Sequence, residues 1–291
     1  MPATLSTPSV TPRQPPPGFW RRFARNRAAV AGLAIVAGML LVALGGPLVY
    51  RADPFAVVWA PLAPPGEAGF WLGTDYLGRD LLAGLVYGAR TTLVVGTAAA
   101  LCTVVIGVLL GASAGYYGGW VDALLMRVTE FFQVLPALLL AMVLVALFAP
   151  TLTTIALAIG VVSWPLVARL VRAEFLRLRE REFVLAARAL GASDRRLIWG
   201  VILPNALPPL IVTAALLVGV AILFEAGLSF LGLGDPNVMS WGLMIGSNRD
   251  YIFDAWWAVT FPGLAIFLTV LSLSLVGDGL NDALNPRLRE R

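Results

Sequence analysis

The residues that carry most enzyme chemistry are absent from this sequence. Its 21 basic side chains are all Arg, it has no His, and its single thiol is Cys102. A P-loop needs its Lys, and zinc sites, haem ligation and Ser-His-Asp triads need His or several Cys. The 17 carboxylates are scattered rather than paired. The sequence therefore predicts no catalytic residue, no metal site and no cofactor bound by this chain.

Charge is concentrated in one arginine-rich segment. Residues 169–196 contain eight Arg, and Glu182–Arg196 reads EFVLAARALGASDRR. An Arg at the centre of a membrane helix costs about 2.5–3.5 kcal/mol, so this segment must lie in water. A basic balance can also indicate nucleic acid. Here the arginines flank apolar runs, where membrane topology explains them, and we expect no nucleic-acid partner.

Within that segment, residues 182–190 have the spacing of a helix. At 100° per residue one stripe is formed by Phe183, Ala186, Ala187 and Leu190. Gly191 suits the left-handed position that ends a helix, and Ser193 can cap the next one. Such a stripe can enter a groove of another protein, or it can pack back on this protein's own surface. Periodicity alone leaves both alternatives open.

Most of the remaining chain suits a lipid bilayer. Hydrophobic residues make up 59% of the sequence and charged residues 13%, about half the charged share of soluble domains. A membrane helix needs about 20 apolar residues, and the charge-free runs of that length are 28–50, 91–121, 131–168, 197–224 and 255–277. The run 131–168 is too long for one span, and we expect a turn at Ala149-Pro150-Thr151. The sequence thus predicts an all-α polytopic membrane protein with six transmembrane helices.

The distribution of arginine orients these six helices. Basic residues favour the cytoplasmic side, and with six spans 17 of the 21 Arg lie on one side together with both termini. We therefore expect the N- and C-termini to be cytoplasmic. The first apolar run is too long for a cleavable signal peptide. The predicted organisation is a cytoplasmic N-terminal tail with an interfacial segment (1–27), a first transmembrane helix (28–50), an extracytoplasmic segment (51–90), a unit of five transmembrane helices with a cytoplasmic loop at 169–206 (91–277), and a cytoplasmic C-terminal tail (278–291).

The cytoplasmic loop carries a familiar pattern. The stretch AARALGASDRRLIWGVILPN resembles the signature of permease subunits of binding-protein-dependent ABC importers, which is Glu-Ala-Ala, three residues, Gly, nine residues, then Ile-x-Leu-Pro. The matching residues are Ala186, Ala187, Gly191, Leu203 and Pro204. Leu185 stands where the family has Glu, which puts a polar contact by that Glu in doubt, although Glu182 lies one turn earlier. Val201 stands in place of Ile, which changes little.

Four further stretches narrow the resemblance. WLGTDYLGRDLLAGLVYGARTTL (71–93), ILFEAGLSFLGLG (222–234), SWGLMI (240–245) and GDGLNDALNPR (277–287) are similar to the dipeptide/oligopeptide/nickel permeases. The similarity is to the subunit type that includes the dipeptide permease C protein, and it covers nearly the whole chain. It implies a type I ABC importer permease fold, with 91–277 as the permease domain, in a bacterial or archaeal cytoplasmic membrane.

The resemblance also implies a mechanism and partners. Residues 182–190 would be a coupling helix that docks into a separate ATPase subunit. The residues it assigns to this contact are Glu182, Phe183, Ala186, Ala187, Leu190, Gly191, Ala192, Leu203 and Pro204. The chain would pair with a homologous permease as a heterodimer and bind two ABC ATPase subunits, which use ATP and Mg. It would receive solute from an extracytoplasmic binding protein.

The expected solute is a dipeptide or oligopeptide. Nickel, glutathione or an oligosaccharide is the alternative within the family, because specificity resides largely in the binding protein. An ATP-independent secondary transporter or channel is the alternative from another class, and a membrane scaffold is a third. Transporters of the second class often show ion-coupling charge clusters or inverted repeats, and this sequence shows neither.

Several residues have both a functional and a structural interpretation. Glu225 lies in the fifth span and either contacts the transport pathway or makes a hydrogen bond near the outer interface. Asp75, Arg79 and Asp80 either meet the binding protein or form a turn, with Asp80 capping a short helix from Leu81.

Small and aromatic residues make three further predictions. Gly107, Gly111 and Gly115 recur every four residues, which indicates close helix packing. The chain is expected to break at Leu203–Pro209, where the fifth span begins. An interfacial aromatic belt is expected at Trp241, Trp256 and Trp257.

Overall fold

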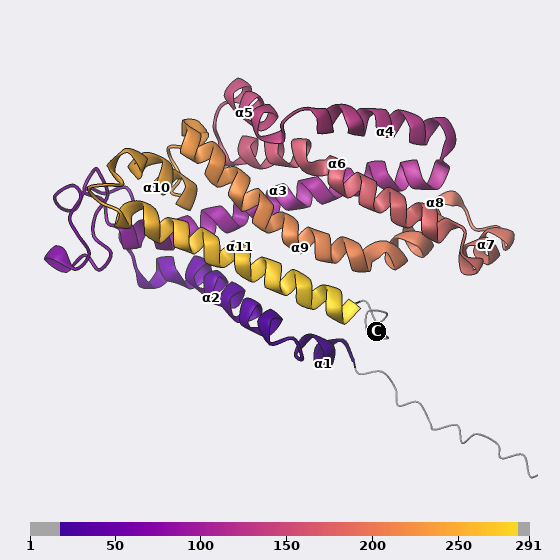
Figure 1. Cartoon of the computed structure of the whole chain (residues 1–291), viewed down its shortest axis with the longest axis horizontal. Coiled ribbons are helices and arrows are strands. Elements are labelled where there is room, and N and C mark those ends of the chain that lie inside the picture. The colour runs from indigo at the N-terminus through magenta and orange to yellow at the C-terminus, as the bar shows by residue number, and fades with distance from the viewer. Residues whose placement is uncertain (1–17, 285–291) are drawn as a thin grey trace, which may run out of the picture.

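The computed structural model describes residues 18–284 and is helical through most of that range, with isolated β-bridges but no strand among those residues. Long helices run side by side along the molecule (Figure 1). They are α2 (Arg27–Val49), α3 (Leu81–Tyr117), α6 (Leu152–Arg179), α9 (Leu203–Leu228) and α11 (Trp257–Leu284). The all-α prediction is confirmed. The tails 1–17 and 285–291, parts of the two predicted cytoplasmic tails, lie outside the described residues.

Five of the described helices are long and apolar enough to cross a membrane, and a sixth crossing exists only if a bent pair counts as one. That pair is α4 (Gly119–Val134) and α5 (Ala137–Phe148), whose axes differ by 88°. The apolar stretch before the expected turn at Ala149-Pro150-Thr151 is thus two helices at a steep angle and not one, while the turn itself lies between α5 and α6 as expected. The break falls at Leu135, whose φ of −79° and ψ of 132° are extended, because a residue before proline is pushed out of the helical region.

Helix α3, the second long helix, begins ten residues earlier than the charge-free run 91–121. Asp80 caps it, since its Oδ1 accepts the amide hydrogen of Leu82 at 2.9 Å. The predicted cap is thus confirmed, but the helix it starts is 37 residues long rather than short. The helix therefore runs across the expected boundary at residue 90, and its first turns pack on protein. Gly84 and Gly88 lie against α10 (Trp241–Asn248).

Helices α3 and α6 pack with their backbones close together. A Cβ added to Gly107 would lie 2.5 Å from Cβ of Val167, and one added to Gly115 would lie 2.6 Å from Cβ of Phe175. Gly111 faces the backbone of Ala168 in the same way. The prediction of close packing along this glycine stripe is confirmed, and small residues are what allow membrane helices to approach so closely.

The expected break at Leu203–Pro209 is absent. The chain is continuously helical from Asp194 to Leu231, up to the left-handed Gly232, and passes through a π-helical segment, Leu197–Ile202, into α9. Pro204 occupies the first turn of α9, where a missing N–H is tolerated. The wider π turns just before it accommodate the missing hydrogen bond, so proline here does not end the helix.

The two ends of the bundle differ. Helix α1 (Phe19–Phe23), the end of α11 and the arginine-rich loop lie at one end (Figure 1). The start and finish of the described chain meet there, since Asn26 donates to Asp282 Oδ2 at 3.0 Å. The irregular segment 51–80 and α10 form a lobe at the other end (Figure 1).

The aromatic belt was predicted incorrectly for two of its three residues. Trp241 and Trp257 are buried inside the lobe, with 1% and 8% exposure, and only Trp256 is exposed. Trp241 is held by its indole N–H, which donates to the backbone oxygen of Leu85 at 3.0 Å. Its amphipathic ring therefore packs helices together instead of meeting headgroups.

Candidate functional site

Helix α7 (Glu182–Ala189) follows α6 after a sharp turn and ends as the sequence predicts. Gly191 has a φ of +83°. Its amide donates to the backbone oxygen of Arg188 at 3.0 Å, and the amide of Ala192 donates to Ala187 at 3.1 Å. These two bonds define a Schellman cap, which requires a left-handed residue at Gly191.

One face of α7 is anchored on the protein and the other is exposed. Val184 is fully buried in a hydrophobic cluster with Phe175 and Leu197, and Ala187 packs against the same cluster. Phe183 and Leu190 are 44% and 89% exposed.

The stripe therefore does not pack back on this chain as a whole. Its outward members are Phe183, Ala186 and Leu190, while Ala187 turns inward. Glu182 and Leu185 are also exposed. The buried Val184 was missed by the sequence analysis, although it lies three residues before Ala187 on the same helical face.

The other residues assigned to this site lie on either side of α7. Ala192 and Leu203 pack against the hydrophobic cluster that holds Val184. Pro204 is exposed in the first turn of α9. The structure thus brings Ala187, Ala192 and Leu203 to one cluster, and Pro204 lies beside it on the continuous helix.

Polar contacts tie this loop to the end of α3. The Tyr116 hydroxyl donates to Asp194 Oδ1 at 2.6 Å, and the Arg188 guanidinium lies 5.8 Å from the centre of the Tyr116 ring. Arg179 donates from Nη1 to the backbone oxygens of Gly115 and Tyr116. These carbonyls belong to the last turn of α3, where a cation is favourable. A movement of α7 must therefore act on α3 as well as on α6.

A further ion pair joins α6 to α4. Arg172 donates two parallel hydrogen bonds to Asp122, and Nη2 lies 2.6 Å from Oδ2. Such a bidentate pair fixes orientation as well as distance. Neither this pair nor the Tyr116 contact was identified from sequence, because the partners are 50 and 78 residues apart.

Glu225 lies at the other end of the bundle and is 1% exposed. The hydroxyls of Ser229 and Ser240 each donate to its Oε1 at 2.8 Å. Ser240 is also the N-cap of α10, since its oxygen accepts the amide hydrogen of Leu243 at 3.1 Å. The contacts of Glu225 therefore join α9 to α10, while its Oε2 is buried without a hydrogen-bond partner among the described residues.

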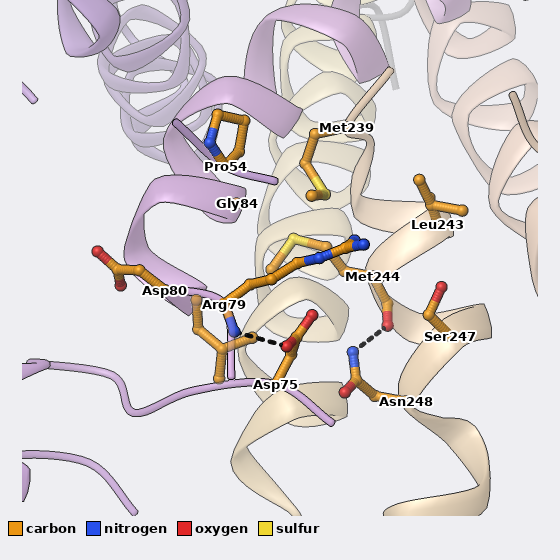
Figure 2. Close-up of a pocket in the computed structure, with 11 residues that line it drawn as sticks. Pro54, Asp75, Arg79, Asp80, Gly84, Met239, Leu243, Met244, Ser247 and Asn248 are labelled. Carbon is orange, nitrogen blue, oxygen red and sulfur yellow. Dashed lines mark hydrogen bonds between the residues drawn. The ribbon is translucent and has the colours of Figure 1, made fainter. Parts of the chain in front are cut away.

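Asp75 and Arg79 organise the loop before α3. Asp75 Oδ1 accepts the amide hydrogens of Leu77 and Arg79, each at 2.8 Å. Burial raises the pKa of the Asp75 carboxyl above its ordinary value. The Arg79 side chain extends across a small pocket toward Met244 (Figure 2), and its guanidinium lies 5.2 Å from the Phe55 ring centre.

Asp80 joins the end of α2 to the start of α3. Its Oδ2 accepts the hydroxyl hydrogen of Tyr50, and burial together with this carboxylate raises the pKa of Tyr50 to about 12. The three charged residues predicted to meet a partner or to form a turn are thus the framework of a turn. Among residues 18–284, no three His, Cys, Asp or Glu side chains are placed to hold a metal ion.

Two known protein families match parts of this chain. Residues 107–290 match the binding-protein-dependent transport system inner membrane component family. The chain belongs to this family. Residues 18–65 of the permease match the N-terminal transmembrane domain of oligopeptide transport permease C. The resemblance inferred from the loop signature is confirmed, and so is a multi-pass inner-membrane location.

Relatives match the permease over nearly its full length. It is 45% identical to the dipeptide transport system permease protein DppC of Escherichia coli, over 96% of this chain and 95% of the relative. It is 42% identical to the di/tripeptide transport system permease protein DppC of Pseudomonas aeruginosa, over 99% and 97%. The DppC protein of Bacillus subtilis is also 42% identical, over 93% and 85%.

A solved structure supports the fold. An inward-facing structure of the MetNI methionine ABC transporter matches with a TM-score of 0.57 and 21% sequence identity, covering 69% of the permease and 96% of that chain. The predicted importer permease fold is confirmed.

Proposed function

We propose that this permease is a membrane subunit of an ATP-driven importer that translocates dipeptides or oligopeptides delivered by an extracytoplasmic binding protein. A peptide is the proposed solute because the permease is 42–45% identical, over nearly its full length, to permeases named for dipeptide or di/tripeptide transport. ATP hydrolysis belongs to two partner ATPase subunits, since this sequence has no Lys for a P-loop. The second membrane subunit is a homologous permease.

The proposed coupling site is α7. Its exposed residues Phe183, Ala186 and Leu190 form an apolar ridge that can enter a groove of an ATPase subunit. The buried Val184 and the Schellman cap at Gly191 hold the ridge in place. Closure of the ATPases around ATP then moves α7 as a rigid unit, which is how nucleotide state biases an alternating-access transition.

The orientation follows from charge. Basic residues favour the cytoplasmic side, which supports a cytoplasmic position for the Arg-rich end of the bundle that carries α7. The lobe formed by 51–80 and α10 then faces the binding protein. In this arrangement Glu225 and Asp80 keep the lobe attached to the long helices, and the surface of the lobe makes the contacts with the partner.

The test is reconstitution of the whole complex. The tagged permease should co-purify with a sister permease and a P-loop ATPase, and proteoliposomes with the binding protein should take up a labelled dipeptide only with ATP. Uptake by the purified chain alone, or uptake independent of ATP, would refute the importer and favour a secondary transporter or channel. ATP-driven uptake of nickel, an oligosaccharide or glutathione, with no uptake of peptides, would replace only the solute.

A further inference from the structure

Helix α3 carries one charged side chain. Arg90 is the only Asp, Glu, Lys or Arg from Leu81 to Tyr117. It lies nine residues into the helix, about 14 Å from its start. Arg90 is exposed and forms no ion pair with any carboxylate of residues 18–284. A cation in an apolar helix usually faces a partner or an aqueous cavity, so Arg90 lacks a counter-charge that its position calls for.

Arg90 lines a hollow that is open to solvent. Polar groups are supplied by Tyr87 and Thr91 on α3 and by Asn237 on the connection before α10. Most of the other lining residues are apolar, among them Val94 and Leu152. Apolar walls with a few convergent polar groups are typical of sites for small molecules. No Asp or Glu lines this hollow, so its one charge is positive.

The hollow lies at the lobe end of the bundle. It shares Pro54 and Met239 with the small pocket beside Arg79 (Figure 2). The proposed coupling helix contacts the opposite end of α3, where Arg188 lies over the ring of Tyr116. On the proposed function, which this inference depends on, solute arrives at the lobe end and would meet Arg90 early on its way.

We propose that the hollow binds the carboxylate of the peptide being imported. The planar guanidinium of Arg90 matches a carboxylate with two parallel hydrogen bonds, and Tyr87, Thr91 and Asn237 offer further hydrogen bonds nearby. A metal cation would be repelled by this charge. Because the hollow is open to water, the pair is weak, which suits a site that must release its solute.

Labelling of a cysteine beside Arg90 tests whether the peptide carboxylate binds in the hollow. Val94 is 57% exposed and lies one turn beyond Arg90, so we would introduce Val94→Cys into a Cys102→Ala background of the complete importer. An anionic methanethiosulfonate should label it faster than a cationic one. A dipeptide with the binding protein should slow labelling by roughly two- to fivefold, the scale of an exposed ion pair. Arg90→Gln should abolish both effects, and Arg90→Lys should keep the charge preference.

The matched control is Arg51→Gln. Arg51 is an exposed arginine beside the same lobe, bonded to the backbone oxygen of Leu48, and it does not line the hollow. Its replacement should leave both effects intact. Protection that persists in Arg90→Gln would overturn the proposal. Protection by the binding protein without peptide would also overturn it, because the hollow would then be a protein-docking surface.

Transport provides an independent readout. Arg90→Gln should slow dipeptide uptake by the same two- to fivefold without changing ATPase stimulation by the binding protein. Unchanged uptake would contradict a carboxylate site on the pathway. If the wild-type complex imports no peptide, the proposed function fails first; if it imports peptide and Arg90→Gln behaves identically, only the carboxylate site fails.

Discussion

Gly191→Val isolates the backbone geometry that ends α7, the proposed coupling helix. Gly191 adopts a φ of +83°, and nothing lies within 4 Å of the position that a Cβ would take. The substitution therefore creates no clash. Its whole effect comes from the left-handed conformation, which β-branched side chains rarely adopt.

The free-energy cost of Gly191→Val can be bounded in two ways. Holding an L-residue in the left-handed region costs about 1–2 kcal/mol. Leaving that region breaks the two cap bonds, Gly191 to Arg188 and Ala192 to Ala187, at about 0.5–1.5 kcal/mol each. Either way the native end of α7 loses about 1–3 kcal/mol, and each 1.4 kcal/mol lowers its population relative to alternatives about tenfold. Gly191→Ala should be milder, and Gly191→Asn should come nearest to wild type, since Asn tolerates this region.

The assay compares dipeptide uptake with binding-protein-stimulated ATPase activity, at matched amounts of assembled complex. For Gly191→Val we expect uptake per ATP hydrolysed to fall severalfold or more. Gly232 is the matched control, with a φ of +85° and nothing within 4 Å of a Cβ, just beyond the far end of the helix that begins at Asp194. Gly232→Val carries similar strain and should leave the ratio unchanged. Near wild-type uptake and ATPase activity in Gly191→Val would remove α7 from the coupling mechanism.

Three further predictions concern stability. Glu225→Gln keeps an acceptor for the Ser240 hydroxyl and should leave uptake unchanged, whereas Glu225→Leu leaves that buried hydroxyl unpaired and should cost about 1–3 kcal/mol; equal melting temperatures of the two purified complexes would contradict this. Gly111→Leu overpacks the contact with α6 and should lower the free energy of unfolding by at least about 1–3 kcal/mol. Gly38→Leu, with open space around its Cβ, is the control and should keep the elution volume and melting temperature of the wild type. Asp75 has a raised pKa in the fold, so the folded lobe binds more protons than the unfolded chain, and its stability should fall as pH rises from the ordinary carboxyl pKa through the raised one. Asp75→Asn should flatten that dependence in hydrogen exchange of the lobe, and an unchanged profile would show that Asp75 is not its source.

The sequence predicted the helices whose limits depend on local properties. Residues 28–50 became α2 with bounds Arg27–Val49, because an apolar run in lipid can satisfy its backbone hydrogen bonds only as a helix. The start of α3 was misplaced because charge was taken as the limit of a span. Arg90 is tolerated inside α3 because it lines a solvent-open hollow.

At the proposed coupling site, too, local features could be predicted from the sequence and long-range contacts could not. The end of α7 could be predicted because a left-handed glycine cap is a local signal. The contacts that hold α7 could not be predicted, since Tyr116 meets Asp194 across 78 residues and Arg172 meets Asp122 across 50. Val184 was overlooked because a short helix with small residues on several sides has no unique apolar stripe.

The prolines of the fifth span show how a local signal can be overridden. Leu203–Pro209 looks like a break in sequence, but the π-helical segment before Pro204 lets one helix run from Asp194 to Leu231. At one end Asp194 accepts the hydrogen bond of Tyr116 beside α7, and near the other end Glu225 holds the cap of α10. On the proposed mechanism, a hinge at Pro204 would absorb the motion of α7 locally. A continuous helix must instead carry that motion to the lobe, so the absence of a break is what allows the ATPase end and the solute end to move together.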